Sequence, residues 1–194
     1  MDPRLKAEGD GESRRKHPGQ FQEAKMQPWI DRLEAVNRAV GSTVRWLALA
    51  MVLLQFAVVL LRYVFGISFI FLNEGVLYMH AALFMLGAGY TLLVDAHVRV
   101  DIFYSRRSRR GRALTDLFGA FGFLLPSMLV LLWVTWPSVR NSWAVLEGPI
   151  SVGGIPASFL MKSLIPAFCI LLIVQGLACA LRDLLRLRGA DDPA

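Results

Sequence analysis

Long runs without charged residues dominate the hydrophobic pattern of this chain. Such runs occupy residues 75–94, 117–139 and 163–181. A helix rises about 1.5 Å per residue, so about 20 residues cross the roughly 30 Å hydrocarbon layer of a bilayer. Only 16 uncharged residues separate Arg45 from Arg62, but Arg62 can extend its side chain into the headgroups. The pattern predicts four transmembrane helices, at about 45–65, 75–95, 116–137 and 161–182.

The composition favours an all-α integral membrane protein over a soluble one. Hydrophobic residues make up 55% of the 194 residues, and the mean hydropathy is +0.48. A globular protein of this size rarely contains three charge-free runs of this length. We therefore treat residues 28–188 as one membrane domain.

Lysine and arginine are distributed unevenly around the predicted spans. Of the 21 such residues, nine precede or begin the first span, six lie between the second and third, and three follow the fourth. The opposite side holds only Arg62, Arg140 and Lys162. Because cationic segments stay in the cytoplasm, both termini are predicted to be cytoplasmic. The net charge of +6 then reflects topology and attraction to anionic membrane lipids, which argues against nucleic-acid binding.

The segments before the first span differ in pattern. Residues 1–27 are polar and predict a disordered cytoplasmic tail, and residues 189–194 are predicted to be a second cytoplasmic tail. The first membrane helix is expected to act as an uncleaved anchor. In residues 28–42, Trp29, Leu33, Val36 and Val40 recur at helical spacing with Ile30 beside them, and Pro28 suits a first helical turn. This predicts an amphipathic helix lying in the membrane interface; a cytosolic extension of the first transmembrane helix is the alternative.

The residue types that carry chemistry form no recognisable catalytic, cofactor or metal site. His80 is the only histidine in a predicted span, which disfavours a haem held by paired histidines, so we expect it to hydrogen-bond a neighbouring helix. Cys169 and Cys179 would lie about 15 Å apart along one helix, too far to form a disulfide. The sequence has no phosphate-binding glycine loop and no nucleophile beside a base. An enzyme is therefore not predicted.

Small residues mark helix faces that could approach a neighbour closely. They are Gly75, Ala82, Gly87 and Gly89 in the second span, and Gly119 and Gly122 in the third. In lipid, close backbone approach contributes strongly to helix association. We expect these faces to pack on each other or on a partner chain.

Two polar groups stand at opposite ends of the second span. Arg62 and Glu74 flank a short connection and could form an ion pair; the alternative is a solvated arginine and a glutamate favoured by the helix dipole. His97, Arg99 and Asp101 alternate with apolar residues and could form a network or dock a partner. An ordinary polar turn is the alternative for this second group.

Five short motifs lie around the predicted helices. They are Arg62-Tyr63-Val64-Phe65-Gly66, Asn73-Glu74, Leu86-Gly87-Ala88-Gly89-Tyr90, His97-Val98-Arg99-Val100-Asp101 and Gly154-Ile155-Pro156. Their order and spacing resemble the small membrane subunit, the DctQ type, of tripartite ATP-independent periplasmic (TRAP) transporters, over about residues 30–185. Asn73 departs from this pattern, because many relatives have a second acidic residue there. The departure disfavours any mechanism that needs two carboxylates at this place.

The resemblance implies a small permease subunit of the bacterial inner membrane. In this family a large membrane subunit carries the transport pathway and the coupling-ion sites, and a periplasmic binding protein delivers the solute. Uptake is usually driven by sodium, and the solute is commonly an organic acid. The small subunit is thought to enlarge the fixed scaffold of the large one and to need no cofactor of its own. A membrane anchor of a redox enzyme and a small autonomous transporter are the alternatives.

The resemblance also suggests roles for particular residues. Arg62 and Glu74 would fix the external hairpin, and His97, Arg99 and Asp101 would organise its cytoplasmic end. Tryptophans are expected at the membrane–water interfaces. They are Trp29 in the interfacial helix and Trp133, Trp136 and Trp143 at the external end of the third span.

Overall fold

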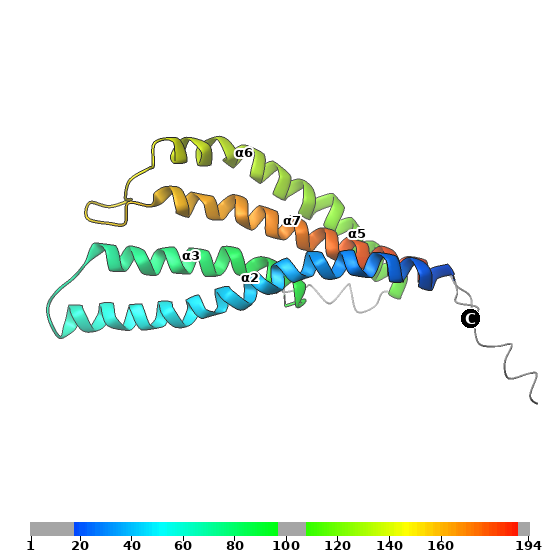
Figure 1. The fold of residues 1–194 in the computed structure, drawn as a ribbon, viewed down its shortest axis with the longest axis horizontal. Coiled ribbons are helices and arrows are strands. Elements are labelled where there is room, and N and C mark those ends of the chain that lie inside the picture. Colours follow the sequence, from blue (N-terminus) through cyan, green and yellow to red (C-terminus); the bar gives the residue numbers. More distant parts are fainter. Residues whose placement is uncertain (1–17, 97–107, 190–194) are drawn as a thin grey trace, which may run out of the picture.

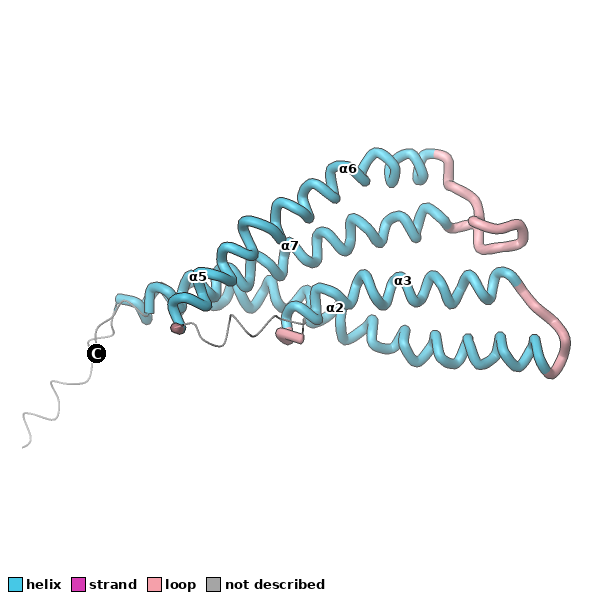
Figure 2. The backbone as a smooth tube through the Cα atoms, turned by 180° about the vertical axis from the view of Figure 1, so that it is seen from behind, coloured by secondary structure: helices cyan, strands magenta, loops and turns pink. Residues whose placement is uncertain are grey.

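A computed structural model of the protein describes residues 18–96 and 108–189, and these segments are almost entirely helical (Figure 2). The helices are α2 (Pro18–Tyr63), α3 (Ile70–Leu93), α5 (Arg109–Gly119), the π-helix η1 (Ala120–Leu124), α6 (Leu125–Ala144) and α7 (Ser158–Gly189). Four stretches are long and apolar enough to cross a membrane, namely Met26–Tyr63, Ile70–Leu93, Arg110–Ala144 and Ser158–Leu185. The prediction of an all-α protein with four membrane helices is confirmed.

Two helical hairpins form the bundle, and α7 is its central helix (Figure 1). One hairpin consists of α2 and α3, and the other of α6 and α7; α7 also packs against α2, α3, α5 and η1. The second predicted span therefore packs on α2 and α7, and the third packs on α7, with little contact between the two spans. The connections 64–69 and 145–157 lie at one end of the bundle, here called the loop end. The start of α2 and the end of α7 lie at the other, here called the terminal end.

The first helix corrects the prediction for the N-terminal region. α2 is one continuous helix of 46 residues with Pro28 inside it. It begins at Pro18, within the segment predicted to be a disordered tail, and it does not break at residue 42 into an interfacial helix. The alternative, an extension of the first transmembrane helix, is what the structure shows.

The buried face of this extension explains the difference. The apolar face that was expected to rest on the membrane contains Trp29 and Val36, which are 62% and 47% exposed on the bundle. A different stripe at helical spacing is buried against the bundle, and it consists of Ile30, Glu34, Asn37, Gly41 and Val44. Because this stripe runs on without interruption into the membrane span, the extension packs as part of the same helix.

Prolines shape the other long helices. Pro126 has no backbone N–H to donate to the carbonyl of Gly122, and its ring crowds that carbonyl. The π-turn Ala120–Leu124 lies directly before it and accommodates the mismatch. The third span continues through α6, which contains Pro137, to Ala144 and is longer than predicted. Figure 1 shows α5, η1 and α6 following one curved path along α7.

Candidate functional site

At the loop end, the connection between α6 and α7 encloses the carboxylate of Glu74. Glu74 lies in the second turn of α3 and is only 6% exposed. Its Oε1 accepts a hydrogen bond from the backbone N–H of Ser151 at 3.1 Å, and its Oε2 accepts one from Ile155 at 2.7 Å. Hydrogen bonds from backbone donors to an ionised carboxylate are among the stronger ones in proteins. They fasten α3 to the second hairpin.

Two glycines allow the connection to come this close. A Cβ atom at Gly154 would collide with the carboxylate of Glu74, so a larger residue there would push the carboxylate out of its present position. Gly153 has φ +83°, in the left-handed region that other residues rarely adopt. The sequence contains both glycines, but nothing in the pattern indicates that they lie against α3.

The expected ion pair between Arg62 and Glu74 is absent from the described part of the chain, so that prediction is wrong. Arg62 lies in the last turn of α2 and is exposed. Glu74 faces the other hairpin, where two N–H groups compensate its charge. A buried carboxylate needs such compensation, and backbone donors supply it without an arginine.

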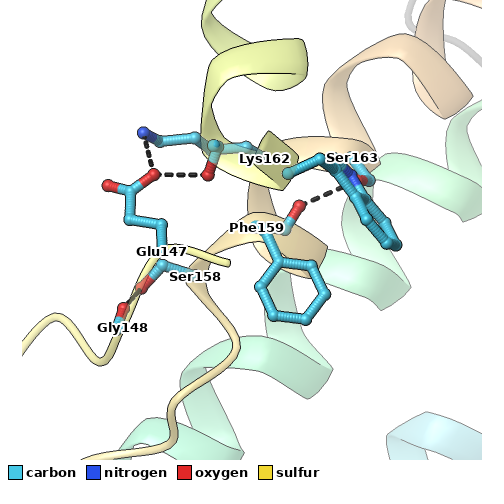
Figure 3. Close-up of polar contacts among 8 residues, drawn as sticks. Glu147, Gly148, Ser158, Phe159, Lys162 and Ser163 are labelled. Atoms are coloured by element: carbon cyan, nitrogen blue, oxygen red, sulfur yellow. Dashed lines mark hydrogen bonds and ion pairs between the residues drawn. The ribbon is translucent and has the colours of Figure 1, made fainter. Parts of the chain in front are cut away.

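A second contact at the loop end joins α6 to α7 (Figure 3). The carboxylate of Glu147 accepts hydrogen bonds from Lys162, at 2.5 Å, and from the hydroxyl of Ser142. These contacts, chiefly the one from Lys162, hold the pKa of Glu147 below its ordinary value. Next to them, Ser158 Oγ donates to the carbonyl of Gly148 at 2.5 Å. The connection is thus fixed at its beginning and at its end.

Trp143 adds an aromatic contact to this junction. Its indole N–H donates to Ser163 Oγ at 2.7 Å, and its ring meets that of Phe159 edge to face at 4.8 Å between centroids. Trp133 and Trp136 lie on the same helix and are 79% and 55% exposed. Their location at a membrane interface stays a prediction.

At the terminal end, buried polar side chains join α2 to α7. Asn37 Nδ2 donates to the backbone carbonyl of Leu171 and to Gln175 Oε1, both at 3.2 Å. Asn37 and Gln175 are fully buried. Glu34, one turn earlier, forms an ion pair with Arg182 and a longer one, at 3.6 Å, with Arg38. We call Glu34, Asn37, Gln175 and Arg182 the terminal-end cluster.

Sequence reasoning missed this cluster, although a signal was present. Glu34 and Asn37 share a helical face with Ile30, Gly41 and Val44. Gln175 is the only amide side chain in the predicted fourth span. Polar side chains at these places find partners across helices, because an unpaired polar group in an apolar environment is costly.

The model of the family "Tripartite ATP-independent periplasmic transporters, DctQ component" matches residues 51–186. The chain belongs to this family. No curated protein and no solved structure matches it. A DctQ chain is a transporter component and not a member of an enzyme family, and with its four apolar helices this one is a multi-pass membrane protein. The match contains Glu74 and its partners, whereas Glu34 and Asn37 precede it.

The small residues of this DctQ chain fall into two groups. Gly75 and Gly89 are used within the bundle: a Cβ at Gly75 would lie 3.3 Å from Leu54, and one at Gly89 would collide with Asn37. Ala82 lines a small cavity between helices. In contrast, a Cβ at Gly87 or Gly119 would meet no atom of the described residues within 4 Å, and one at Gly122 would meet only Phe118 of its own helical segment. Only the first group packs helices in this chain.

The remaining predicted residues of the DctQ chain have simpler outcomes. His97, Arg99 and Asp101 lie outside the described residues. His80 is exposed and makes no hydrogen bond to any described residue, so the expected contact with a neighbouring helix is wrong. Cys169 and Cys179 are not joined by a disulfide, as predicted. The guanidinium of Arg32 lies 5.5 Å above the ring of the exposed Trp29.

Proposed function

We propose that this DctQ chain is the non-catalytic small permease subunit of a TRAP transporter in the bacterial inner membrane, with both termini in the cytoplasm. It enlarges the fixed scaffold of a large membrane subunit, which carries the transport pathway. A periplasmic binding protein delivers an organic acid, and an ion gradient, expected to be sodium, drives its uptake. The family match over residues 51–186 carries this proposal.

The environment of Glu74 supports a structural role for this subunit. A carboxylate on a transport path has to exchange its ligands during each cycle. Both oxygens of Glu74 instead accept hydrogen bonds from the loop that covers it. In the described residues, no three His, Cys, Asp or Glu side chains group so that they could hold a metal ion. Among the buried polar side chains, Glu74, Asn37 and Gln175 form contacts between this chain's own segments.

The distribution of exposed apolar residues also fits a subunit of a larger assembly. Within the four membrane-crossing stretches, α2, α3 and the third span bury only 6–11% of their most apolar windows, whereas α7 buries 44%. Three helices thus offer most of their apolar surface to lipid or to a partner, and α7 holds them together. This arrangement suits a scaffold that adds width to another membrane protein.

The test is reconstitution into liposomes of the chain alone, the large subunit alone, and both together, each with the binding protein and its ligand outside. We expect uptake only when both membrane subunits are present, and we expect it to depend on an inward sodium gradient. Uptake by this chain alone, or equal uptake without it, would contradict the scaffold role. The orientation can be tested in intact cells by placing a single cysteine near each terminus of the protein. A thiol reagent that cannot cross the membrane should label neither cysteine.

A further inference from the structure

A groove of about 620 Å³ lies between α2 and α3. Its polar rim is formed by Arg38, Ser42 and Arg45 of α2, and its apolar wall includes Leu83, Phe84 and Gly87 of α3. This volume is within the range of sites that hold small molecules. The groove belongs to neither polar cluster described above.

Glycines give the groove its shape. At Gly41, the ring of Tyr90 occupies the space that a Cβ would take, so α2 and α3 approach closely there and close one side of the groove. At Gly87, in contrast, a Cβ would meet nothing within 4 Å. The wall of α3 is therefore open at this residue, and Phe84, 73% exposed, stands beside it. An apolar chain can lie in this space.

The rim carries positive charge and no carboxylate. Arg38 is 69% exposed at its side chain, and its contact with Glu34 is long, 3.6 Å, because Glu34 is held mainly by Arg182. Arg45 has its guanidinium 5.8 Å from the ring of Trp46, and no carboxylate of the described residues forms an ion pair with it. Arg45 thus has no carboxylate partner among the described residues, and the exposed side chain of Arg38 can bind an anion from outside the protein beside its long contact with Glu34.

The level of the groove relative to the membrane indicates the kind of anion that would bind. Arg45 is the last charged residue before the 16-residue apolar run of α2, so it stands where the hydrocarbon layer of a membrane would begin. The wall at Leu83, Phe84 and Gly87 continues from this level into the apolar part of α3. A ligand that fills the groove needs an anionic group at one end and an apolar chain at the other.

We propose that the groove between α2 and α3 binds an anionic phospholipid of the surrounding bilayer. Its phosphate lies between Arg38 and Arg45, and an acyl chain lies along Leu83, Phe84 and Gly87. The lipid fills the gap that Gly87 leaves between two helices and ties the extension of α2 to the membrane surface. This inference requires only that α2 and α3 cross a membrane, and it does not depend on the transported solute or on the large subunit.

The test is lipid binding to the full-length chain, purified in detergent and delipidated, with native mass spectrometry as the measurement. Phosphatidylglycerol and phosphatidylcholine of the same chain length are titrated separately. We expect one phosphatidylglycerol to bind in clear preference to phosphatidylcholine. Changing both Arg38 and Arg45 to Gln should weaken the binding of phosphatidylglycerol about 25-fold, because each arginine near a membrane surface contributes about fivefold to the affinity. Arg62→Gln, an exposed arginine at the other end of α2, is the control and should leave binding unchanged.

A second variant tests the acyl-chain half of the site without changing charge. Gly87→Leu should fill the groove and abolish the preferred binding, whereas Gly119→Leu, which also meets open space, should not. Thermal unfolding of each variant verifies that it is folded. Equal affinity of the wild type for the two lipids overturns the proposal. Wild-type affinity for phosphatidylglycerol in the double arginine variant, or in Gly87→Leu, overturns it too. Loss of a co-purified large subunit in Gly87→Leu with lipid binding intact would mean that the groove is a protein contact, which overturns it as well.

Discussion

The two ends of the bundle fasten buried carboxylates by different chemistry. At the loop end, Glu74 is bound by backbone N–H groups of Ser151 and Ile155. At the terminal end, Glu34 is bound by the side chain of Arg182. Backbone donors depend on the path of the loop, whereas a side-chain donor depends on one residue. The loop end should therefore be sensitive to glycines and to Glu74, and the terminal end to the identity of each polar partner.

Glu74→Ala should have the largest effect on stability. It removes two charge-assisted hydrogen bonds and leaves two N–H groups without their acceptor, so we expect the free energy of unfolding to fall by about 3–5 kcal/mol. Thermal unfolding in detergent measures this. Asn73→Ala is a matched control, because Asn73 is the neighbouring residue, is exposed and bonds only the carbonyl of Phe69 in its own helix. A loss of equal size in both variants would exclude the loop contact as the cause.

Substitution of Arg62 tests the hypothesis that Arg62 forms an ion pair with Glu74. Arg62 is exposed and Glu74 faces the other hairpin. The free energy of unfolding of Arg62→Ala should therefore lie within about 0.5 kcal/mol of the wild-type value. Exchanging the two charges, Arg62→Glu with Glu74→Arg, should not restore the stability that Glu74→Arg loses. Recovery in the double variant would revive the ion pair.

Gly89→Leu tests the terminal end and should have the next largest effect. A Cβ at Gly89 would collide with the amide of Asn37 and lie 3.2 Å from the Cβ of Leu171, so a leucine must displace the buried Asn37 side chain and press on α7. We expect a loss of about 3 kcal/mol in the free energy of unfolding, at the upper end of overpacking effects. Gly119→Leu is the control, because its added side chain meets open space. Equal stability of the two variants would contradict the close approach at Gly89.

The contact between Asn37 and Gln175 should contribute less. Asn37→Leu and Gln175→Leu each break their hydrogen bond, and a double-mutant cycle isolates the pair. We expect a coupling energy of about 0.6 kcal/mol and at most about 1.7, as found for hydrogen bonds between membrane helices. Additive losses would mean that the two side chains act independently.

The same comparison explains how much of this protein the sequence could predict. The four spans were correctly predicted because an apolar run of membrane length is a local property. The contacts of Glu74 were not, because they join residues 74 and 155, and no local pattern records which loop folds over a helix. The pairing with Arg62 was chosen because the two residues are near in sequence and opposite in charge. Backbone N–H groups, which every residue except proline carries, leave no trace in a pattern of side chains.

The prediction for the N-terminal region was wrong for a related reason. Trp29, Val36 and Val40 form an apolar stripe, from which a separate helix resting on the membrane was predicted. In a membrane protein lipid can cover an apolar face, so the face that turns inward can be the one with polar partners to satisfy. Glu34 and Asn37 have such partners on α7. Apolar periodicity therefore identifies a helix here but not its buried side.

The smallest expected effect concerns Glu147, which distinguishes the exposed part of the loop end from the buried carboxylate of Glu74. Lys162, and after it Ser142, lowers the pKa of Glu147 from the ordinary value of 4.5. A carboxyl group whose pKa is lowered by folding stabilises the folded state above its unfolded pKa, and this stabilisation is lost as the pH falls through the folded pKa.

The unfolding temperature of the wild type should thus exceed that of Lys162→Gln slightly at pH 7. The difference should shrink as the pH drops below about 4.5. The ion pair is partly exposed, so added salt should reduce the difference as well. A gap between the two proteins that stays constant from pH 7 to pH 3 would show that Lys162 acts by packing and not by its charge.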